Sequence, residues 1–204
     1  MVFEVRIHGR GGQGVVTAAE LLAAAAFEEG RFAQAFPSFG SERTGAPVVS
    51  YCRLGEREIR TREPVMIPDA LIVLDPTLVH QVDLFDGLSG TGFVLINSTP
   101  TFDELGLGDL LERFVKDRLI TMPATAMAQR HVGRPVPNAV LLGGFAALTS
   151  EVSIEAVTKA VRNRFGTEPT VAQRNVAAAA EAYAYVHRKM IDGVEKAMLN
   201  APTD

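Results

Sequence analysis

The chain has 204 residues, of which 47% are hydrophobic and 22% charged, and its formal net charge is −4. This length favours a single globular domain over residues 1–204, with a core of ordinary size. A pI near 5.6 argues against a nucleic-acid partner, since sequence-independent binding to phosphates needs a surplus of Lys and Arg. We therefore expect no DNA- or RNA-binding function.

Cysteine usage and apolar runs narrow the class further. Cys52 is the only cysteine, so the chain alone forms no intrachain disulfide and houses no thiolate-ligated iron–sulfur cluster. Glu4 and Arg6 interrupt the segment that would be apolar in a signal peptide. The longest apolar run, residues 21–27, is far shorter than the roughly 20 residues of a membrane span. We expect a cytoplasmic protein without a membrane partner.

The first fifth of the chain predicts a strand, a tight turn and a helix. Residues 2–8 alternate apolar and polar side chains, a glycine cluster occupies 9–14, and residues 15–29 are rich in Ala, Leu and Glu. A second short strand is expected at 31–36. It leads into a loop at 37–47 that contains many turn residues, and loops of this length are often functional.

Further β-structure is predicted between residues 48 and 122. Residues 48–54 and 57–60 flank a glycine-containing turn and predict a β-hairpin that forms an antiparallel flap on the main sheet. Continuous apolar runs at 70–74 and 92–96 are typical of buried parallel strands, and 119–122 predicts a last, shorter strand.

The remainder of the chain predicts helices. We expect them at residues 124–131, 138–150, 153–165 and from 170 to about 199, with Ser153 as an N-cap. Strands that alternate with helices indicate an α/β fold. We therefore predict a Rossmann-like, mostly parallel sheet with flanking helices, a β-hairpin flap and a helical C-terminal part.

Three glycines carry the most specific local motif. Gly9, Gly11 and Gly14 satisfy G-x-G-x-x-G between a predicted strand and a predicted helix. Backbone N–H groups at such a helix start can bind a phosphate or diphosphate. The alternative is that the glycines only permit a sharp turn and close packing of helix on sheet. Gln13, a polar side chain on this turn, slightly favours a ligand.

Two familiar nucleotide sites fit less well. A dinucleotide site would need an acidic residue at the end of the second strand, but that strand ends at Phe36, and Glu28 and Glu29 lie within the preceding helix. A P-loop would need Gly-Lys-Ser/Thr, whereas two valines follow the last glycine. The sequence therefore argues against NAD and against ATP hydrolysis.

The other candidate residues favour structural roles. No histidine has a second ligand at metal-binding spacing; the four are His8, His80, His131 and His187. Asp75 lies in a turn that starts a helix, and neither it nor Asp83 and Asp86 has a matching base or nucleophile. Cys52 is expected to be a buried, unreactive thiol, since it lies in an apolar strand.

Two segments leave alternatives open. The loop at 37–47 concentrates polar residues between glycines and prolines, so it is either a solvated loop or a contact surface for a ligand or subunit. These residues are Ser38, Ser41, Glu42, Arg43 and Thr44. Residues 176–184 are rich in alanine, which permits close approach either of a partner's helix or of a helix in the same chain.

Several ordered motifs resemble one family. Residues 9–22, GRGGQGVVTAAELL, resemble the opening of the gamma subunits of 2-oxoacid:ferredoxin oxidoreductases. The resemblance continues, without gaps inside each motif, through residues 33–40, 42–43, 45–48, 69–77 and 138–149. Within this family, FPSFGSERTGAPV is similar to the pyruvate branch, whereas 2-oxoisovalerate and 2-oxoglutarate relatives tend to carry Pro-Ser-Tyr-Gly. Those two branches remain the alternatives.

The resemblance implies a reaction and partners. The expected reaction is the reversible, coenzyme A-dependent oxidative decarboxylation of a 2-oxoacid to acyl-CoA and CO2, with reduction of ferredoxin. The chain lacks the Gly-Asp-Gly motif that grips thiamine diphosphate through Mg²⁺. Thiamine diphosphate, Mg²⁺ and iron–sulfur clusters are therefore expected on partner alpha and beta subunits, with or without a ferredoxin-like delta subunit.

The resemblance also suggests what this chain contributes. We expect no catalytic residue and no metal ligand in it, but a contact with the diphosphate of coenzyme A, to which Arg10 adds charge. The residues expected at that contact are Arg10, Gly11, Gly12, Gln13, Gly14 and Val15. A neighbouring cleft or subunit contact is expected at Ser38, Glu42, Arg43 and Thr44. The competing functions are a free-standing CoA- or nucleotide-binding module and an NAD-dependent dehydrogenase.

Overall fold

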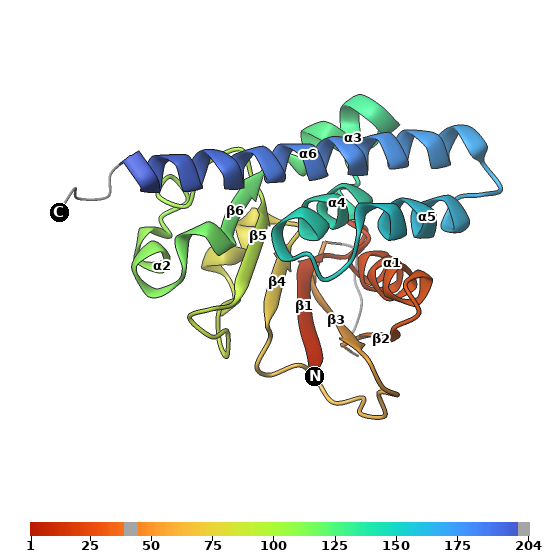
Figure 1. Cartoon of the computed structure of the whole chain (residues 1–204), viewed down its shortest axis with the longest axis horizontal. Coiled ribbons are helices and arrows are strands. Elements are labelled where there is room, and N and C mark those ends of the chain that lie inside the picture. Colours follow the sequence, from red (N-terminus) through yellow and green to blue (C-terminus); the bar gives the residue numbers. More distant parts are fainter. Residues whose placement is uncertain (39–44, 200–204) are drawn as a thin grey trace.

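A six-stranded sheet forms the centre of the computed structural model, which describes residues 1–38 and 45–199 (Figure 1). The strand order is β2-β3-β1-β4-β5-β6. The strands are β1 Val2–Arg10, β2 Phe32–Pro37, β3 Pro47–Gly55, β4 Ala70–Val73, β5 Phe93–Asn97 and β6 Leu119–Met122. β1, β4, β5 and β6 are parallel, while β3 runs antiparallel to both β1 and β2. The predicted mostly parallel α/β sheet is confirmed.

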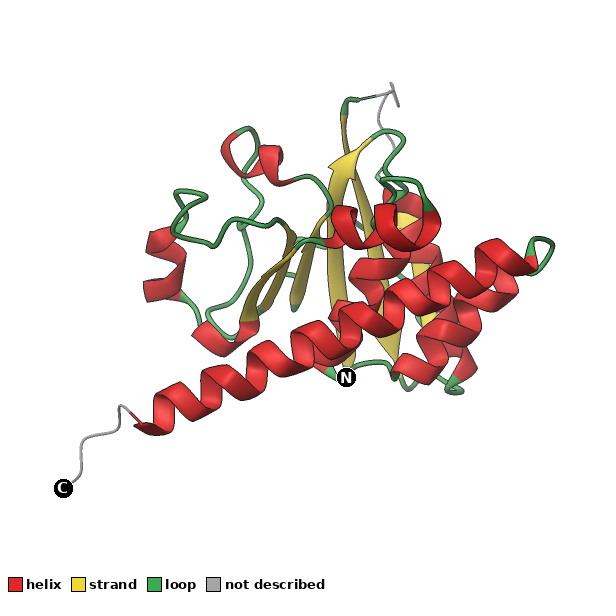
Figure 2. Cartoon of the chain, turned by 90° about the horizontal axis from the view of Figure 1, so that it is seen from above, coloured by secondary structure: helices red, strands yellow, loops and turns green. Residues whose placement is uncertain are grey.

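Helices follow most of the strands and dominate the second half of the chain. They are α1 Val15–Glu28, η1 Pro76–His80, α2 Gly108–Arg113, η2 Lys116–Arg118, α3 Ala124–Val132, α4 Asn138–Thr149, α5 Ile154–Arg164 and α6 Pro169–Leu199. α6 has 31 residues and runs along the whole domain beside α3, α4 and α5 (Figures 1 and 2). None of the helices in the described ranges has a stretch long and apolar enough to cross a membrane.

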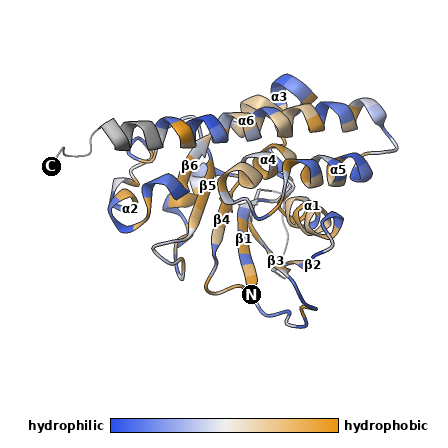
Figure 3. Cartoon of the chain, viewed as in Figure 1, coloured by the Kyte–Doolittle hydropathy of each residue, from blue (hydrophilic) through white to orange (hydrophobic). Residues whose placement is uncertain are grey.

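Both faces of the parallel strands are buried, which explains their continuous apolar sequences. Ile7 and Ile72 point to one face and pack among residues of α1, α4 and α6. Leu71 and Val73 point to the other face, under η1 and the segment 84–114. Figure 3 shows hydrophobic residues concentrated in the strands and α4, with hydrophilic residues on α5 and much of α3.

The predicted hairpin is wrong in its second strand. Residues 57–60 form no strand, and β3 pairs with β2 on one side and with β1 on the other. Both hydrogen-bonding edges of β3 are thus occupied, and the charged Arg57, Glu58 and Arg60 lie exposed beyond its end. The antiparallel strand of the fold is therefore β3, which lies between β1 and β2 and extends the main sheet.

The alanine-rich stretch packs within the chain. Ala178, Ala179 and Ala182 of α6 are fully buried, and α6 makes its most extensive contact with α4. A Cβ built at Gly143 of α4 would lie 2.0 Å from the carbonyl oxygen of Ala179. Small residues on both helices thus allow their backbones to approach closely, which accounts for this composition without a partner's helix.

Candidate functional site

The turn between β1 and α1 requires its glycines. Gln13 N donates to Arg10 O at 3.0 Å, and Gly12 and Gly14 have φ angles of +95° and +81°, where a side chain is strained. A Cβ built at Gly9 would lie 2.6 Å from Val15 Cγ2, so this glycine lets the strand and helix pack closely. The glycines are therefore needed for the sharp turn and for the close packing of the helix on the sheet, as the structural interpretation of the motif predicts.

The same turn also leaves the start of α1 open. Gly14 is the N-cap of α1, and no side chain caps its first N–H groups within the described residues. Around Gly12, an added Cβ would meet no described atom within 4 Å. The first N–H groups of α1 are thus free to bind an anion, helped by the positive end of the helix dipole.

Asp75, at the end of the neighbouring strand β4, holds this turn in place. Its Oδ2 accepts hydrogen bonds from Arg10 Nε at 3.1 Å and Gln13 Nε2 at 2.8 Å, while its Oδ1 accepts from Thr77 N at 2.9 Å. Gln13 Oε1 in turn accepts from Arg10 N at 2.7 Å. Burial alone would raise the pKa of Asp75, but the hydrogen bonds from Thr77 and Gln13 and the charge of Arg10 lower it on balance. The expected structural role of Asp75 is thus specific: it positions the glycine turn.

The side chains of two expected ligand contacts, Arg10 and Gln13, are hydrogen-bonded to other residues of the chain. Gln13 contacts Asp75, and the guanidinium of Arg10 donates further to Thr77 Oγ1, Gln81 Oε1 and the carbonyl oxygen of Gly45 at 2.8, 2.8 and 3.1 Å. Arg10 is therefore committed to acceptors of its own chain. What the turn offers outward is backbone N–H rather than these side chains.

One end of the polar loop lies against the glycine turn. Gly11 N donates to Ala46 O at 2.9 Å, and Gly45 N donates to Gly11 O at 3.2 Å. At the other end, the exposed Ser38 donates its N–H to Val49 O at 2.8 Å. The remaining residues expected there lie outside the described residues; they are Ser41, Glu42, Arg43 and Thr44.

Gly14 also lines a cavity of about 480 Å³. It lies between the starts of α1, α4 and α6 and the end of α5. Three arginines and one glutamate line it, and we call it the arginine cavity. Its polar residues, beside Gly14, are Thr17, Arg134, Asn138, Arg164, Glu168, Arg174 and Asn175. No local pattern predicts this cavity, because its arginines lie on three separate segments that only the tertiary fold brings together.

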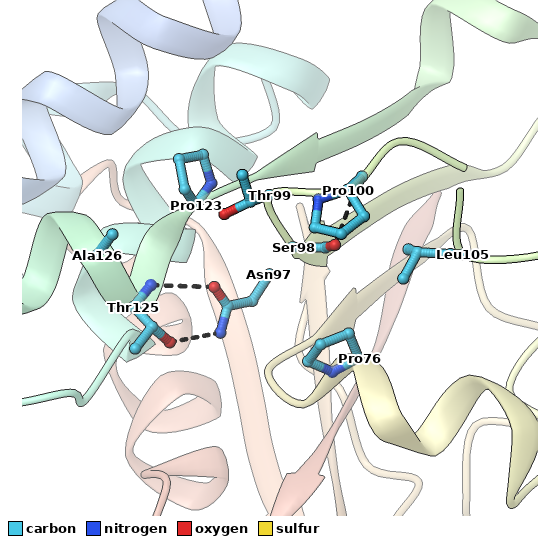
Figure 4. Close-up of a pocket in the computed structure, with 9 residues that line it drawn as sticks. All are labelled: Pro76, Asn97, Ser98, Thr99, Pro100, Leu105, Pro123, Thr125 and Ala126. Carbon is cyan, nitrogen blue, oxygen red and sulfur yellow. Dashed lines mark hydrogen bonds between the residues drawn. The ribbon is translucent and has the colours of Figure 1, made fainter. Parts of the chain in front are cut away.

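A second pocket, of about 280 Å³, lies at the carboxyl ends of β5 and β6 (Figure 4). There Asn97 Nδ2 donates to Leu74 O at 2.8 Å and Thr125 Oγ1 at 2.7 Å, and Thr125 N donates to Asn97 Oδ1 at 3.0 Å. Among the described residues that line it, none is charged. Its polar groups are largely satisfied by one another, so it is a poor site for an anion.

The remaining candidates are buried within the fold. His8 lies in β1, and burial, with the nearby charge of Arg6, lowers its pKa to about 3, so it is neutral. Cys52 is fully buried and its pKa is raised by burial, which confirms the expected unreactive thiol. Over residues 1–38 and 45–199, no three His, Cys, Asp or Glu side chains gather as they would around a metal ion.

Comparison with known proteins assigns the family. Residues 4–185 match the family described as pyruvate ferredoxin/flavodoxin oxidoreductase. Pyruvate synthase subunit PorC of Methanosarcina barkeri is 46% identical over 159 residues, which are 78% of this chain and 84% of the relative. The pyruvate/ketoisovalerate oxidoreductases common subunit gamma of Pyrococcus furiosus is 42% identical over 184 residues, 89% of this chain and 96% of the relative.

A solved structure agrees with this assignment. Pyruvate oxidoreductase subunit PORC from Thermotoga maritima superposes with a TM-score of 0.74 at 32% identity, covering 90% of this chain and 96% of its own. Sequence and fold thus lead to the same family over most of the chain. The chain belongs to the pyruvate ferredoxin/flavodoxin oxidoreductase family, as a gamma-type subunit of a 2-oxoacid:ferredoxin oxidoreductase.

Proposed function

We propose that this chain assembles with alpha and beta subunits into a pyruvate-type oxidoreductase and forms part of its coenzyme A site. The partners would hold thiamine diphosphate, Mg²⁺ and the iron–sulfur clusters. The described part of this chain offers no metal-binding cluster, and its Cys52 is buried. Its contribution is therefore binding and positioning rather than redox chemistry.

The open start of α1 is the observation that carries the CoA proposal. No side chain of the described residues caps the start of α1, a Cβ at Gly12 would meet open space, and α1 supplies a positive dipole end to the N–H groups of Gly12, Gly14 and Val15. A diphosphate group fits such a turn because its oxygens accept several hydrogen bonds at once. The carboxyl ends of the parallel strands are also where α/β sheets bind ligands.

In this proposal Arg10 positions the turn instead of meeting the phosphates directly. Its guanidinium is held by Asp75, Thr77 and Gln81, and these contacts fix the end of β1 against η1. The described end of the polar loop, Gly45 and Ala46, lines the same turn through its hydrogen bonds with Gly11. The turn is thus preorganised before any ligand arrives.

We propose that the partner subunits select the 2-oxoacid. One relative at 42% identity is named as a gamma subunit common to pyruvate and ketoisovalerate oxidoreductases. We therefore keep 2-oxoisovalerate as a second substrate for complexes that contain this chain. Assaying the purified complex with pyruvate, 2-oxoisovalerate and 2-oxoglutarate distinguishes these cases.

Substitution of Gly12 tests the CoA contact. Gly12→Val places a side chain in the open space over the free N–H groups, so the assembled enzyme should bind CoA about tenfold more weakly. CoA-independent decarboxylation of pyruvate should stay intact. Calorimetric titration of the complex with CoA, beside an assay of pyruvate decarboxylation, measures both.

Gly30→Val is the matched control for backbone strain. Gly30 also has a positive φ, +75°, and open space for a Cβ, but it lies at the other end of α1. Its substitution should cost similar stability while leaving CoA affinity unchanged. Equal CoA affinity in the wild type and Gly12→Val would refute the glycine-turn contact.

A further inference from the structure

The sheet ends in a strand whose outer edge is free. β2 lies at the edge of the sheet, with β3 on its inner side (Figure 1). Ser38 N donates to Val49 O, and in an antiparallel pair only every second residue bonds the neighbouring strand. This phase directs the main-chain N–H and C=O groups of Ala33 and Ala35 away from β3. Among the described residues, no main-chain hydrogen bond uses these groups.

The free part of this edge is bounded at both ends. Pro37 has no N–H group to donate, and Arg31 N already donates to Ala26 O at 3.1 Å, at the end of α1. The free donors are therefore confined to residues 32–36, whose sequence is FAQAF. This segment reads the same in both directions, with Gln34 at its centre.

We infer that β2 pairs with β2 of a second copy of this chain, antiparallel and about a two-fold axis at Gln34. In this register Ala33 bonds Ala35 of the second copy, and the symmetric pair uses the remaining free N–H and C=O groups. Phe32 lies opposite Phe36 of the second copy, in a pair that exchanges no hydrogen bonds and whose side chains approach closely. The sheets of the two copies thus join into one continuous sheet.

The side chains and charges of β2 suit this contact. Phe32 is 49% exposed, while the ring of Phe36 is held by Tyr51, with centroids 5.2 Å apart, and by the guanidinium of Arg53. A two-fold axis brings each nearby residue close to its own copy, so a charge there would meet a like charge. Residues 32–37 carry no charge, although unpaired edge strands are commonly protected by charged side chains.

α1 enlarges the contact beyond the strand. It packs over β2 and β3, and neighbouring strands lie roughly 4.8 Å apart, so the axis sets the two α1 helices roughly 10 Å apart, an ordinary packing distance. Phe27, in the last turn of α1, is 75% exposed, so this helix end has apolar surface for a partner to cover. The strand edge alone is smaller than the roughly 1,200 Å² of a stable interface, and the paired helices have to supply the remainder.

Cysteine substitutions test the register of this pairing in the purified full-length chain, whose own Cys52 is buried. Gln34→Cys places two cysteines at the axis with their Cα atoms roughly 4.5 Å apart, within the range of a disulfide. Phe32→Cys alone places its two cysteines roughly 14 Å apart, which is too far, but mixed with Phe36→Cys it meets a cysteine directly opposite. Mild oxidation followed by a non-reducing gel measures each cross-link.

Ala35→Pro tests the ladder without a cross-link. It removes an N–H group that bonds nothing within the described residues, and proline is tolerated at such an edge, so the chain should still fold. The dissociation constant of the dimer, measured by sedimentation velocity over a range of concentrations, should rise at least about tenfold. Ala35→Ser keeps the N–H group and is the matched control, and circular dichroism checks the fold of every variant.

We expect a dimeric wild type, a cross-link of Gln34→Cys to itself, and one of Phe32→Cys only in the mixture with Phe36→Cys. In the assembled enzyme, Gln34→Cys should likewise join two copies of this chain. A monomeric wild type, equal self-cross-linking of Phe32→Cys and Gln34→Cys, or an Ala35→Pro dimer as stable as the wild type would each overturn the pairing. So would an assembled enzyme in which Gln34→Cys joins a different subunit or nothing. None of these readouts involves coenzyme A, so their outcome is independent of the proposed function.

Discussion

Two helices start at the same edge of the sheet in opposite ways. α1 follows β1 through the glycine turn, and its N-cap, Gly14, has no side chain to accept from its N–H groups. α3 follows β6, and there Asn97, at the end of β5, accepts a hydrogen bond from Thr125 N at 3.0 Å (Figure 4). One helix start is left open, whereas the other is closed by a buried amide.

The difference separates binding from stability. A side chain that satisfies the first N–H groups of a helix stabilises the fold but leaves nothing there for a ligand. A glycine gives up that stabilisation and leaves the donors free. The charges follow the same division, since arginines adjoin the start of α1 while the described lining of the pocket beside α3 is uncharged. Anion binding is thus expected at α1 alone of these two helix starts.

The largest expected effect comes from opening the closed helix start. Asn97→Ala removes the partners of Leu74 O and of Thr125 N and Oγ1, so the free energy of unfolding should fall by about 3 kcal/mol. Urea denaturation of the purified chain measures this change. The exposed neighbour Thr99→Ala is the control, and CoA binding by the complex should not change. A loss under about 1 kcal/mol would show that Asn97 does not hold α3.

A smaller effect is expected when the open start is filled. Gly14→Ala should lower the free energy of unfolding by about 2 kcal/mol, because it strains a φ of +81° and brings its Cβ to 2.6 Å from Asn138 Nδ2. A double-mutant cycle with Asn138→Ala should recover about 1 kcal/mol of that loss, since the amide is gone.

Gly133→Ala provides the reference for backbone strain alone. Gly133 has a similar φ, +76°, and a Cβ built there meets no described atom within 4 Å. Gly14→Ala should therefore destabilise the chain more than Gly133→Ala in the same urea denaturation. Equal losses would mean that the contact between Gly14 and Asn138 carries no energy, and the open start would then be defined by its backbone angle only.

Local patterns predicted most of the elements. The glycine motif lies between β1 and α1 as expected, and Ser153 caps α5 by accepting from Ala156 N at 3.1 Å. Continuous apolar runs correctly predicted β4 and β5, because central parallel strands are buried on both faces and need no polar side chains. In each case the signal lies within a few consecutive residues, where propensity and burial act together.

The predictions that failed concern residues whose structural partners are distant in the sequence. Residues 57–60 predicted a strand next to β3, but β2 takes that edge, and α2 was missed in a segment of mixed turn and helix residues. Similarly, no pattern in the sequence reveals that Asp75 would hold Arg10 and Gln13, or that Arg134, Arg164 and Arg174 would share a cavity. Such groupings arise from the crossing of elements, which local periodicity does not encode.

The smallest expected effect concerns the support of the open start. The pKa of Asp75 is lowered in the folded chain, so its ionised form stabilises the fold at pH values above the unfolded pKa of about 3.9, and this stabilisation is lost as the pH falls through the folded value. Asp75→Asn should therefore lower the free energy of unfolding by about 1 kcal/mol at pH 7. Below about pH 4 the difference from the wild type should shrink, since the unfolded wild-type chain then takes up a proton that the folded chain takes up only below its lowered pKa.

Urea denaturation of both proteins at pH 7, 5 and 3 tests this pH dependence. Asp83→Asn is the control, since Asp83 takes no part in the hydrogen bonds that hold the glycine turn. A constant difference between wild type and Asp75→Asn at all three pH values would contradict the role of the charge. The carboxylate of Asp75 would then act only through its shape, and the glycine turn would be held chiefly by its own backbone hydrogen bonds with Gly45 and Ala46.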